Sequence, residues 1–186
     1  MPIRWVQASS AEIFGEPTTS PQTEETPLAP VNPYGAAKAY GHLLTGVYRA
    51  RGMHASTVVL YNHESPRRPE RFVTRKITAG VARIAAGQQS ELVLGNLDAR
   101  RDWGWAPDYA KAMWLASERE AAGDYVIATG QAHSVRDFVG AALPRWVSPT
   151  GSTWCASILN SSGPWMPTSW WEMPARPLVS WVGDRR

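Results

Sequence analysis

The pattern of hydrophobic and polar positions divides the first 145 residues into two kinds of segment, which alternate along the chain. Short runs rich in β-branched and other apolar residues predict strands at 3–9, 54–62, 91–95 and 124–130. Between these runs, apolar residues recur at helical spacing, which predicts helices at 33–51, 72–87, 107–120 and 134–143. Strands that alternate with helices are typical of an α/β fold with a largely parallel sheet.

Local signals place the ends of these elements. Five prolines within residues 16–33 predict a loop. Asn32 followed by Pro33 predicts a helix start, with asparagine as the cap and proline in the first turn. Gly52 ends that helix, and Ser134 is expected to cap the last one.

The pattern changes at about residue 145. Residues 146–186 contain six of the ten tryptophans and five prolines, and no helical or alternating period persists there. We therefore divide the chain into a packed part, residues 1–145, and a Trp/Pro/Ser-rich tail, residues 146–186, which we expect to be non-native or disordered.

Composition excludes several classes of protein. With 44% hydrophobic and 19% charged residues, the chain is globular in type. It has no apolar run of the roughly 20 residues needed to cross a membrane and no long apolar N-terminal stretch, so we expect a soluble, cytoplasmic protein. The formal charge of +3 comes without a long basic run, which argues against nucleic acid as a partner. Cys155, the one cysteine, can form neither an internal disulfide nor a thiolate zinc cluster, and no metal site is predicted.

The clearest chemical feature is Tyr34-Gly-Ala-Ala-Lys38 on the first predicted helix. A spacing of four puts both side chains on one helical face. A nearby ammonium favours the phenolate form of a tyrosine, which makes the phenol a usable proton acceptor. The same short pattern also arises by chance on exposed helix surfaces, and both interpretations stay open from the spacing alone.

Polar residues also follow the first two predicted strands. Ser10 and Glu12 come at the end of the first strand, where open α/β sheets bind their ligands, although a serine-rich turn has the same composition. After the second strand comes Asn62-His63-Glu64-Ser65-Pro66-Arg67-Arg68, whose paired arginines suit phosphate groups or a solvated basic loop. The charged residues of Arg101-Asp102-Trp103 suit either a binding site or an ordinary salt-bridged turn. Arg75 and Lys76 suit either a binding site or the solvent-facing side of their helix.

Taken together, these segments resemble the GDP-mannose 4,6-dehydratases, which belong to the extended short-chain dehydrogenase/reductase superfamily. The resemblance covers nearly all of residues 1–145. It lies in QASSAEIFG (7–15), NPYGAAKAY (32–40), LYNHESPRRPERFVTRKI (60–77), LGNLDARRDWG (94–104) and DYVIATGQAHSVRDFV (124–139). It implies a partial Rossmann-type domain, with a doubly wound parallel sheet, and parts of the smaller C-terminal substrate domain.

The resemblance also implies a reaction and roles for particular residues. Such a hydro-lyase uses NADP to oxidise C4 of GDP-mannose, removes water across C5 and C6, and returns the hydride to C6, giving GDP-4-keto-6-deoxymannose. By this resemblance Tyr34 takes the C4 hydroxyl proton and Lys38 assists it and holds the nicotinamide ribose. Glu12 removes the C5 proton and protonates the departing C6 hydroxyl, and Ser10 hydrogen-bonds the C4 oxygen.

The remaining matched positions concern binding. His63 and Arg68, with Tyr34 and Lys38, match cofactor-contacting positions, and Asn62, Lys76 and Arg101 are the candidates for the nucleotide-diphosphate part of the substrate. Family members form homo-oligomers, so the resemblance implies a second copy as a partner. Trp105 stands where the family pattern leads us to expect a histidine after Arg-Asp-Trp-Gly.

Two further expectations concern the ends of the chain. The sequence starts at the strand that carries Ser10 and Glu12 and contains no G-x-x-G-x-x-G turn, so we expect an N-terminally truncated enzyme that lacks much of its NADP site. A shifted reading frame restores family motifs missing from 146–186, so we expect a frameshift near residue 145. We therefore expect the chain alone to be a weak or inactive enzyme, and the alternative is a non-catalytic GDP-sugar-binding or assembly remnant.

Overall fold

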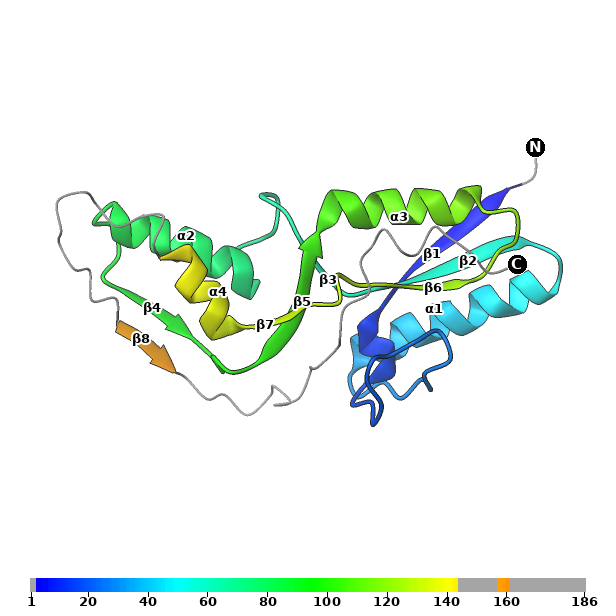
Figure 1. Ribbon diagram of the computed structural model, residues 1–186, viewed down its shortest axis with the longest axis horizontal. Helices are drawn as coiled ribbons and strands as arrows, with labels where there is room; N and C mark the ends of the chain where they lie inside the picture. Colours follow the sequence, from blue (N-terminus) through cyan, green and yellow to red (C-terminus); the bar gives the residue numbers. More distant parts are fainter. Residues whose placement is uncertain (1–2, 144–156, 161–186) are drawn as a thin grey trace. The chain divides into compact units, whose positions relative to one another are not determined.

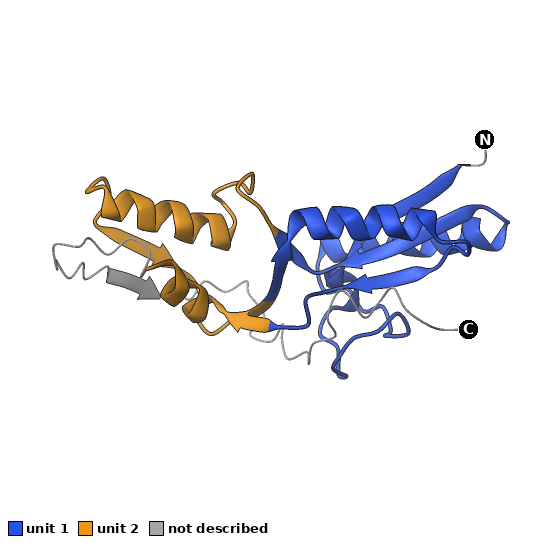
Figure 2. Cartoon of the chain, turned by 45° about the horizontal axis from the view of Figure 1, so that its top comes forward, with its two compact units in different colours: residues 1–63, 102–131, 172–186 blue, residues 64–101, 132–171 orange. Residues whose placement is uncertain are grey.

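The structure, a computed structural model, describes residues 3–143 and 157–160, and it divides into two compact units (Figures 1 and 2). In the described chain, the first unit contains residues 3–63 and Asp102–Gln131. The second unit contains Glu64–Arg101 and residues 132–143 and 157–160. The boundary predicted near residue 145 and most of the predicted tail lie outside the described residues.

A three-stranded parallel sheet forms the centre of the first unit. It consists of β1 (Arg4–Ser10), β2 (His54–Leu60) and β6 (Asp124–Ile127), in the order β1-β2-β6. The central strand β2 is buried along almost its whole length, as expected for a parallel strand covered on both faces. The sequence prediction of an α/β fold with a parallel sheet is confirmed for this unit.

Helices cover both faces of this sheet. Alternate β2 residues point to opposite sides, so Val59 packs with Ala39 of α1 (Pro33–Ala50), while Val58 packs with Tyr109 and Ala116 of α3 (Ala106–Glu118). Figure 1 shows α1 and α3 on opposite sides of the strands. A short 3-10 helix, η1 (Ala11–Phe14), follows β1 and joins the core on the α1 side. This is the doubly wound arrangement that the resemblance implies.

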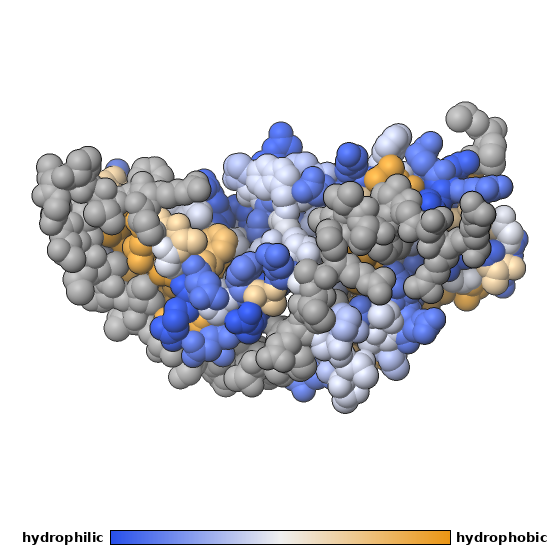
Figure 3. All heavy atoms as spheres, in the orientation of Figure 1, coloured by the Kyte–Doolittle hydropathy of each residue, from blue (hydrophilic) through white to orange (hydrophobic). Residues whose placement is uncertain are grey.

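The second unit combines two helices with short strands. Its helices are α2 (Val73–Ala85) and α4 (Val135–Ala142), and β4 (Glu91–Leu94) pairs in parallel with β8 (Ser157–Asn160). A groove between the helices is lined mainly by small apolar residues, and Figure 3 shows hydrophobic residues gathered in this region. The capping box of Ser134 and Asp137 confirms the predicted helix start, and the hydrogen bonds from Ser134 lower the pKa of the Asp137 carboxyl.

Three short strands were not predicted. They are β3 (Asn62–Glu64), β5 (Arg100–Trp105) and β7 (Ala132–Ser134), hydrogen-bonded in the order β3-β5-β7. The interpretation of Arg101-Asp102-Trp103 as a salt-bridged turn is wrong, because this segment is part of β5. Asp102 is buried and accepts hydrogen bonds from the backbone N–H groups of Thr129 and Gly130 and from the Thr129 hydroxyl.

Within the described part of the chain, no helix has both the length and the apolar character needed to cross a membrane. The cytoplasmic location stays a prediction. Strand β8 falls inside the tail predicted as non-native, whose other residues lie outside the description, so the frameshift also stays a prediction.

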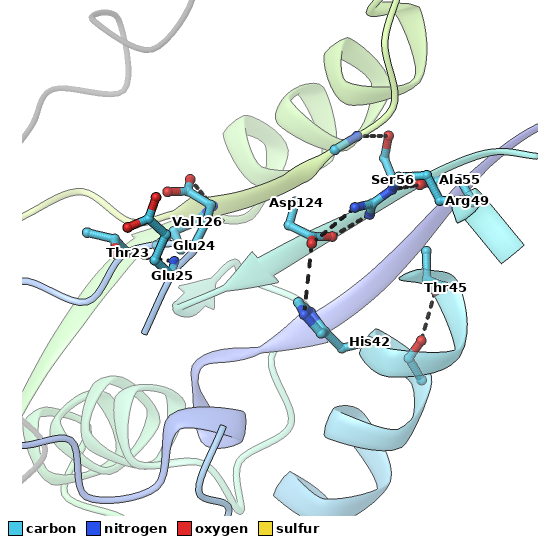
Figure 4. A network of polar contacts seen from close by, with 12 residues as sticks. Thr23, Glu24, Glu25, His42, Thr45, Arg49, Ala55, Ser56, Asp124 and Val126 are labelled. Atoms are coloured by element: carbon cyan, nitrogen blue, oxygen red, sulfur yellow. Dashed lines mark hydrogen bonds and ion pairs between the residues drawn. The ribbon is translucent and has the colours of Figure 1, made fainter. Parts of the chain in front are cut away.

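An ion pair joins α1 to the sheet of the first unit (Figure 4). Both terminal guanidinium nitrogens of Arg49 donate to the carboxylate of Asp124, at the start of β6, and Arg49 Nε donates to the carbonyl of Ala55 in β2 at 2.6 Å. His42 Nε2 lies 4.0 Å from the same carboxylate. Burial alone would raise the pKa of Asp124, but the hydrogen bonds and charge of Arg49, with His42 nearby, hold that pKa below its usual value.

We expect Asp124→Asn to lower the free energy of unfolding by about 1–2 kcal/mol at pH 7, because it removes the charge that pairs with a half-buried guanidinium. A carboxyl whose pKa is lowered by folding stabilises the folded state above its unfolded pKa, and this stabilisation is lost as pH falls through the folded pKa. The difference between wild type and variant should therefore shrink below about pH 4. Urea unfolding followed by circular dichroism across this pH range measures it.

Asp98→Asn is the matched control, because it breaks an ion pair with Arg136 whose side chains are 76% and 62% exposed. Its effect should stay within about 0–0.5 kcal/mol. Equal effects of the two substitutions would contradict the role assigned to Asp124.

Candidate functional site

The first part of the site lies just beyond the carboxyl end of β1. Ser10 is the N-cap of η1, and its hydroxyl accepts a hydrogen bond from the backbone N–H of Glu12 at 3.3 Å. Ile13 and Phe14, which follow in η1, are almost fully buried in the core. The apolar end of η1 thus anchors it, while the Glu12 side chain stays partly exposed.

The second part is the first turn of α1, which packs against η1 (Figure 1). Asn32 caps this helix by accepting the Gly35 N–H at 2.8 Å, and its amide group donates to Glu12 Oε2 at 2.6 Å. Gly35 is buried, and a Cβ atom added there would lie 2.5 Å from the backbone oxygen of Glu12. The missing side chain therefore lets α1 approach η1 this closely.

Tyr34 and Lys38 extend from the same end of α1, as their spacing predicts. Lys38 Nζ lies 5.6 Å from the centre of the Tyr34 ring and donates to the carbonyl of Ala8 in β1 at 2.9 Å. The Tyr34 side chain is 56% exposed, so its phenol is accessible from solvent. The ammonium is thus fixed between the helix and the sheet, close to an accessible phenol.

Tyr61 and Tyr109 are tyrosines of the same unit, but their phenols are more buried than that of Tyr34. Burial, with the charge of Asp102 nearby, raises the pKa of both Tyr61 and Tyr109, so each stays neutral at ordinary pH. The Tyr61 hydroxyl donates to Gln22 Oε1 at 2.7 Å. Tyr34 is therefore the phenol of this group best placed to exchange a proton with a bound molecule.

His63 and Asn62 also belong to the first unit and lie in β3, after the end of β2. The His63 ring stacks on Tyr109 with centroids 4.9 Å apart, and its Nδ1 lies 2.8 Å from the carbonyl oxygen of Tyr61. Because a carbonyl oxygen only accepts, Nδ1 carries the proton in this contact and Nε2 remains for another partner. Asn62 is exposed.

The last three residues singled out in the sequence belong to the second unit. Arg68 pairs with Glu64 at 3.1 Å and lies over the Phe72 ring at 3.6 Å from its centre, while Lys76 is exposed on α2. Arg101 Nη1 donates to the neighbouring carbonyl of Arg100. The structure therefore brings Ser10, Glu12, Tyr34 and Lys38 together in the first unit and places Arg68, Lys76 and Arg101 in the second.

The sequence did not predict one hydrogen bond of this candidate site. It identified Asn32 only as a helix cap and gave no sign of its bond to Glu12, because the two residues are 20 positions apart. The choice of asparagine before Pro33 was the available signal, since this cap residue also carries amide donors. Among residues 3–143, no group of three or more His, Cys, Asp or Glu is arranged to hold a metal ion.

Comparison with solved structures agrees with this fold. A UDP-N-acetylglucosamine 4-epimerase from Methanobrevibacter ruminantium M1 matches 94% of this chain and 54% of its own, with a TM-score of 0.74 at 20% identity. RMD from Pseudomonas aeruginosa, in complex with NADPH, matches 75% of this chain and 50% of its own, with a TM-score of 0.71 at 23% identity. At these identities the likeness concerns the fold alone.

Comparison with known sequences gives matches of much higher identity. Residues 1–154 match the family described as GDP-mannose 4,6 dehydratase. The GDP-mannose 4,6 dehydratase of Drosophila melanogaster is 53% identical over 142 residues, which are 76% of this chain and 36% of that protein. That of Sinorhizobium fredii strain HH103 is 53% identical over 137 residues, 73% of this chain and 39% of the relative. The chain spans well under half the length of these relatives, and it belongs to the GDP-mannose 4,6-dehydratase family.

Proposed function

We propose that the chain carries the acid–base machinery of a hydro-lyase that converts GDP-mannose to GDP-4-keto-6-deoxymannose. The observation that carries this proposal is the packing of η1 on the first turn of α1. It gathers a carboxylate (Glu12), an accessible phenol (Tyr34), an ammonium (Lys38) and a hydroxyl (Ser10) within one unit. An elimination next to a carbonyl needs a base for the acidic proton and an acid for the leaving hydroxyl.

In this mechanism each side chain has a defined role in proton transfer or hydrogen bonding. The Lys38 ammonium favours the phenolate form of Tyr34, and this phenolate takes the proton of the C4 hydroxyl as C4 is oxidised. Ser10 donates a hydrogen bond to the C4 oxygen. The C4 ketone makes the C5 proton acidic, and Glu12 removes that proton and transfers it to the C6 hydroxyl, which leaves as water. When the hydride returns to C6, C5 takes up one proton, which balances the proton that Tyr34 took from the C4 hydroxyl and restores the phenolate.

We propose NADP as the cofactor, and the residues of the first unit fit a nicotinamide nucleotide. The bond to Ala8 uses one of the three protons of Lys38 and leaves donors for ribose hydroxyls, and His63 presents Nε2. When bound, NADP would supply hydride-transfer chemistry, as acceptor of the C4 hydride and donor of a hydride to C6. Arg68 is proposed for the cofactor, and Asn62, Lys76 and Arg101 for the nucleotide-diphosphate part of GDP-mannose.

A second candidate, a non-catalytic GDP-sugar-binding or assembly remnant, has one observation in its favour. The 186 residues contain no G-x-x-G-x-x-G turn, which in dinucleotide-binding folds seats the pyrophosphate at a helix N-terminus. Calorimetric titration with GDP-mannose and with NADP separates the two functions. Binding of the sugar nucleotide without NADP binding or turnover would favour the remnant.

The enzyme is tested by incubating the purified chain with GDP-mannose and NADP and detecting the dehydrated sugar nucleotide by mass spectrometry. We expect Tyr34→Phe and Glu12→Gln each to lower turnover by about 10²-fold or more, since each removes a proton-transfer group. Tyr40→Phe, which changes an exposed tyrosine of the same helix, should leave turnover near the wild-type rate. Turnover that survives Tyr34→Phe would remove Tyr34 from the mechanism.

We further propose that the chain associates with a second copy through an apolar face of α1. Five large residues spaced three or four apart along this helix are 38–68% exposed: Tyr40, Leu43, Leu44, Val47 and Tyr48. The residues buried against the rest of the unit, Gly35, Ala39 and Thr45, lie on other sides of the helix. A contiguous exposed apolar stripe of this kind is typical of an association surface.

Replacing Leu43 with Glu should therefore shift the chain toward the monomer, because association would bury a charge in an apolar contact. Size-exclusion chromatography with light scattering measures the mass. Ala110→Glu adds the same charge at an exposed position of α3 and should leave the mass of the wild type unchanged. A wild-type chain that is monomeric at high micromolar concentration would contradict this association.

A further inference from the structure

The Asn32 carboxamide makes two hydrogen bonds in opposite directions. Its oxygen accepts the Gly35 N–H at 2.8 Å, which caps α1, and its nitrogen donates to Glu12 Oε2 at 2.6 Å. One planar group thus connects the helix that carries Tyr34 and Lys38 to the carboxylate on η1. The side chain of Asn32 is partly buried, so water competes only partly for these bonds.

The identity of the cap residue matters for this connection. Aspartate and serine cap helices about as well as asparagine, because each offers an oxygen to the free N–H groups of the first turn. Aspartate has no proton to donate, and the hydroxyl of serine is too short to replace the second arm of the amide. Helix capping alone therefore does not require asparagine here, whereas the bond to Glu12 does.

Glu12 is held at both ends. Ser10 Oγ accepts its backbone N–H, and Asn32 binds carboxylate oxygen Oε2. Close packing of Gly35 against the Glu12 backbone oxygen fixes the distance between the two segments. A carboxylate bound through one oxygen keeps the other oxygen for proton transfer, and its direction is set by the bound one.

We infer that Asn32 is a positioning residue, which orients the Glu12 carboxylate against the helix that carries Tyr34 and Lys38. The catalytic meaning of this inference rests on the proposed dehydratase function. A base that must reach one carbon-bound proton loses rate when its orientation is free, because the reactive geometry becomes a small fraction of its conformations. Asn32 acts through Glu12 and does not itself exchange a proton.

The contact is tested directly by NMR on the full chain. The side-chain amide protons of Asn32 should shift with pH across the range in which carboxylates titrate, because one of them points at the Glu12 carboxylate. This pH dependence should vanish in Glu12→Gln, and the amide of the exposed Asn62 serves as the internal comparison. An Asn32 amide signal with the same pH response in wild type and Glu12→Gln would overturn the inference.

The functional consequence is tested with Asn32→Ser, which keeps a capping oxygen, is too short to reach Glu12 and adds no charge beside it. We expect the melting temperature to stay close to that of wild type, kcat for GDP-mannose to fall by about tenfold or more, and KM to change little. Asn32→Ala loses the cap as well and should also lower the melting temperature. An unchanged kcat in Asn32→Ser at every pH would overturn the positioning role.

The NMR experiment and the turnover measurement together separate this inference from the proposed function. If the wild-type chain shows no turnover while the Asn32 amide responds to Glu12, the proposed dehydratase activity of this chain fails and the inferred orientation of the carboxylate stands. If turnover is present and the amide does not respond, the proposed function stands and the inference fails.

Discussion

The close packing of η1 on the first turn of α1 is the contact on which the candidate site depends. Glu12 belongs to the segment after β1, whereas Tyr34 and Lys38 belong to a helix whose cap, Asn32, lies 20 residues after Glu12, so only tertiary packing brings them together. Ile13 and Phe14 fix η1 in the core, and Gly35 allows the backbones to approach. The polar contacts of the site are therefore set by an apolar anchor beside them.

The parallel sheet supplies the second constraint. In register, the last residue of β1 is paired with Leu60, the last residue of β2, so the segments that follow both strands start at the same edge of the sheet. Beyond β2, the His63 ring stacks on the buried ring of Tyr109, whose raised pKa keeps its phenol neutral. Tyr34, the phenol proposed to exchange a proton, is by contrast exposed.

Local signals in the sequence predicted much of this fold, and non-local contacts account for what they missed. Asn32 and Pro33 gave the start of α1, and Ser134 gave the cap of α4, because capping depends on residues within one turn. Strand β5 was missed because RRDWGW shows no alternation, and its Asp102 finds its partners 27 and 28 residues away. The spacing of Tyr34 and Lys38 predicted their shared face, but their relation to Glu12 needed the tertiary structure.

The division into two units separates the two requirements of the proposed enzyme. Ser10, Glu12, Tyr34 and Lys38 depend on contacts made entirely within the first unit, whereas Arg68, Lys76 and Arg101 belong to the second. If the proposed roles hold, a change in the second unit should weaken the binding of a nucleotide sugar while the contacts around Glu12 persist. On this proposal, substrate binding and proton transfer depend on different contacts, so a substitution can change one of them without the other.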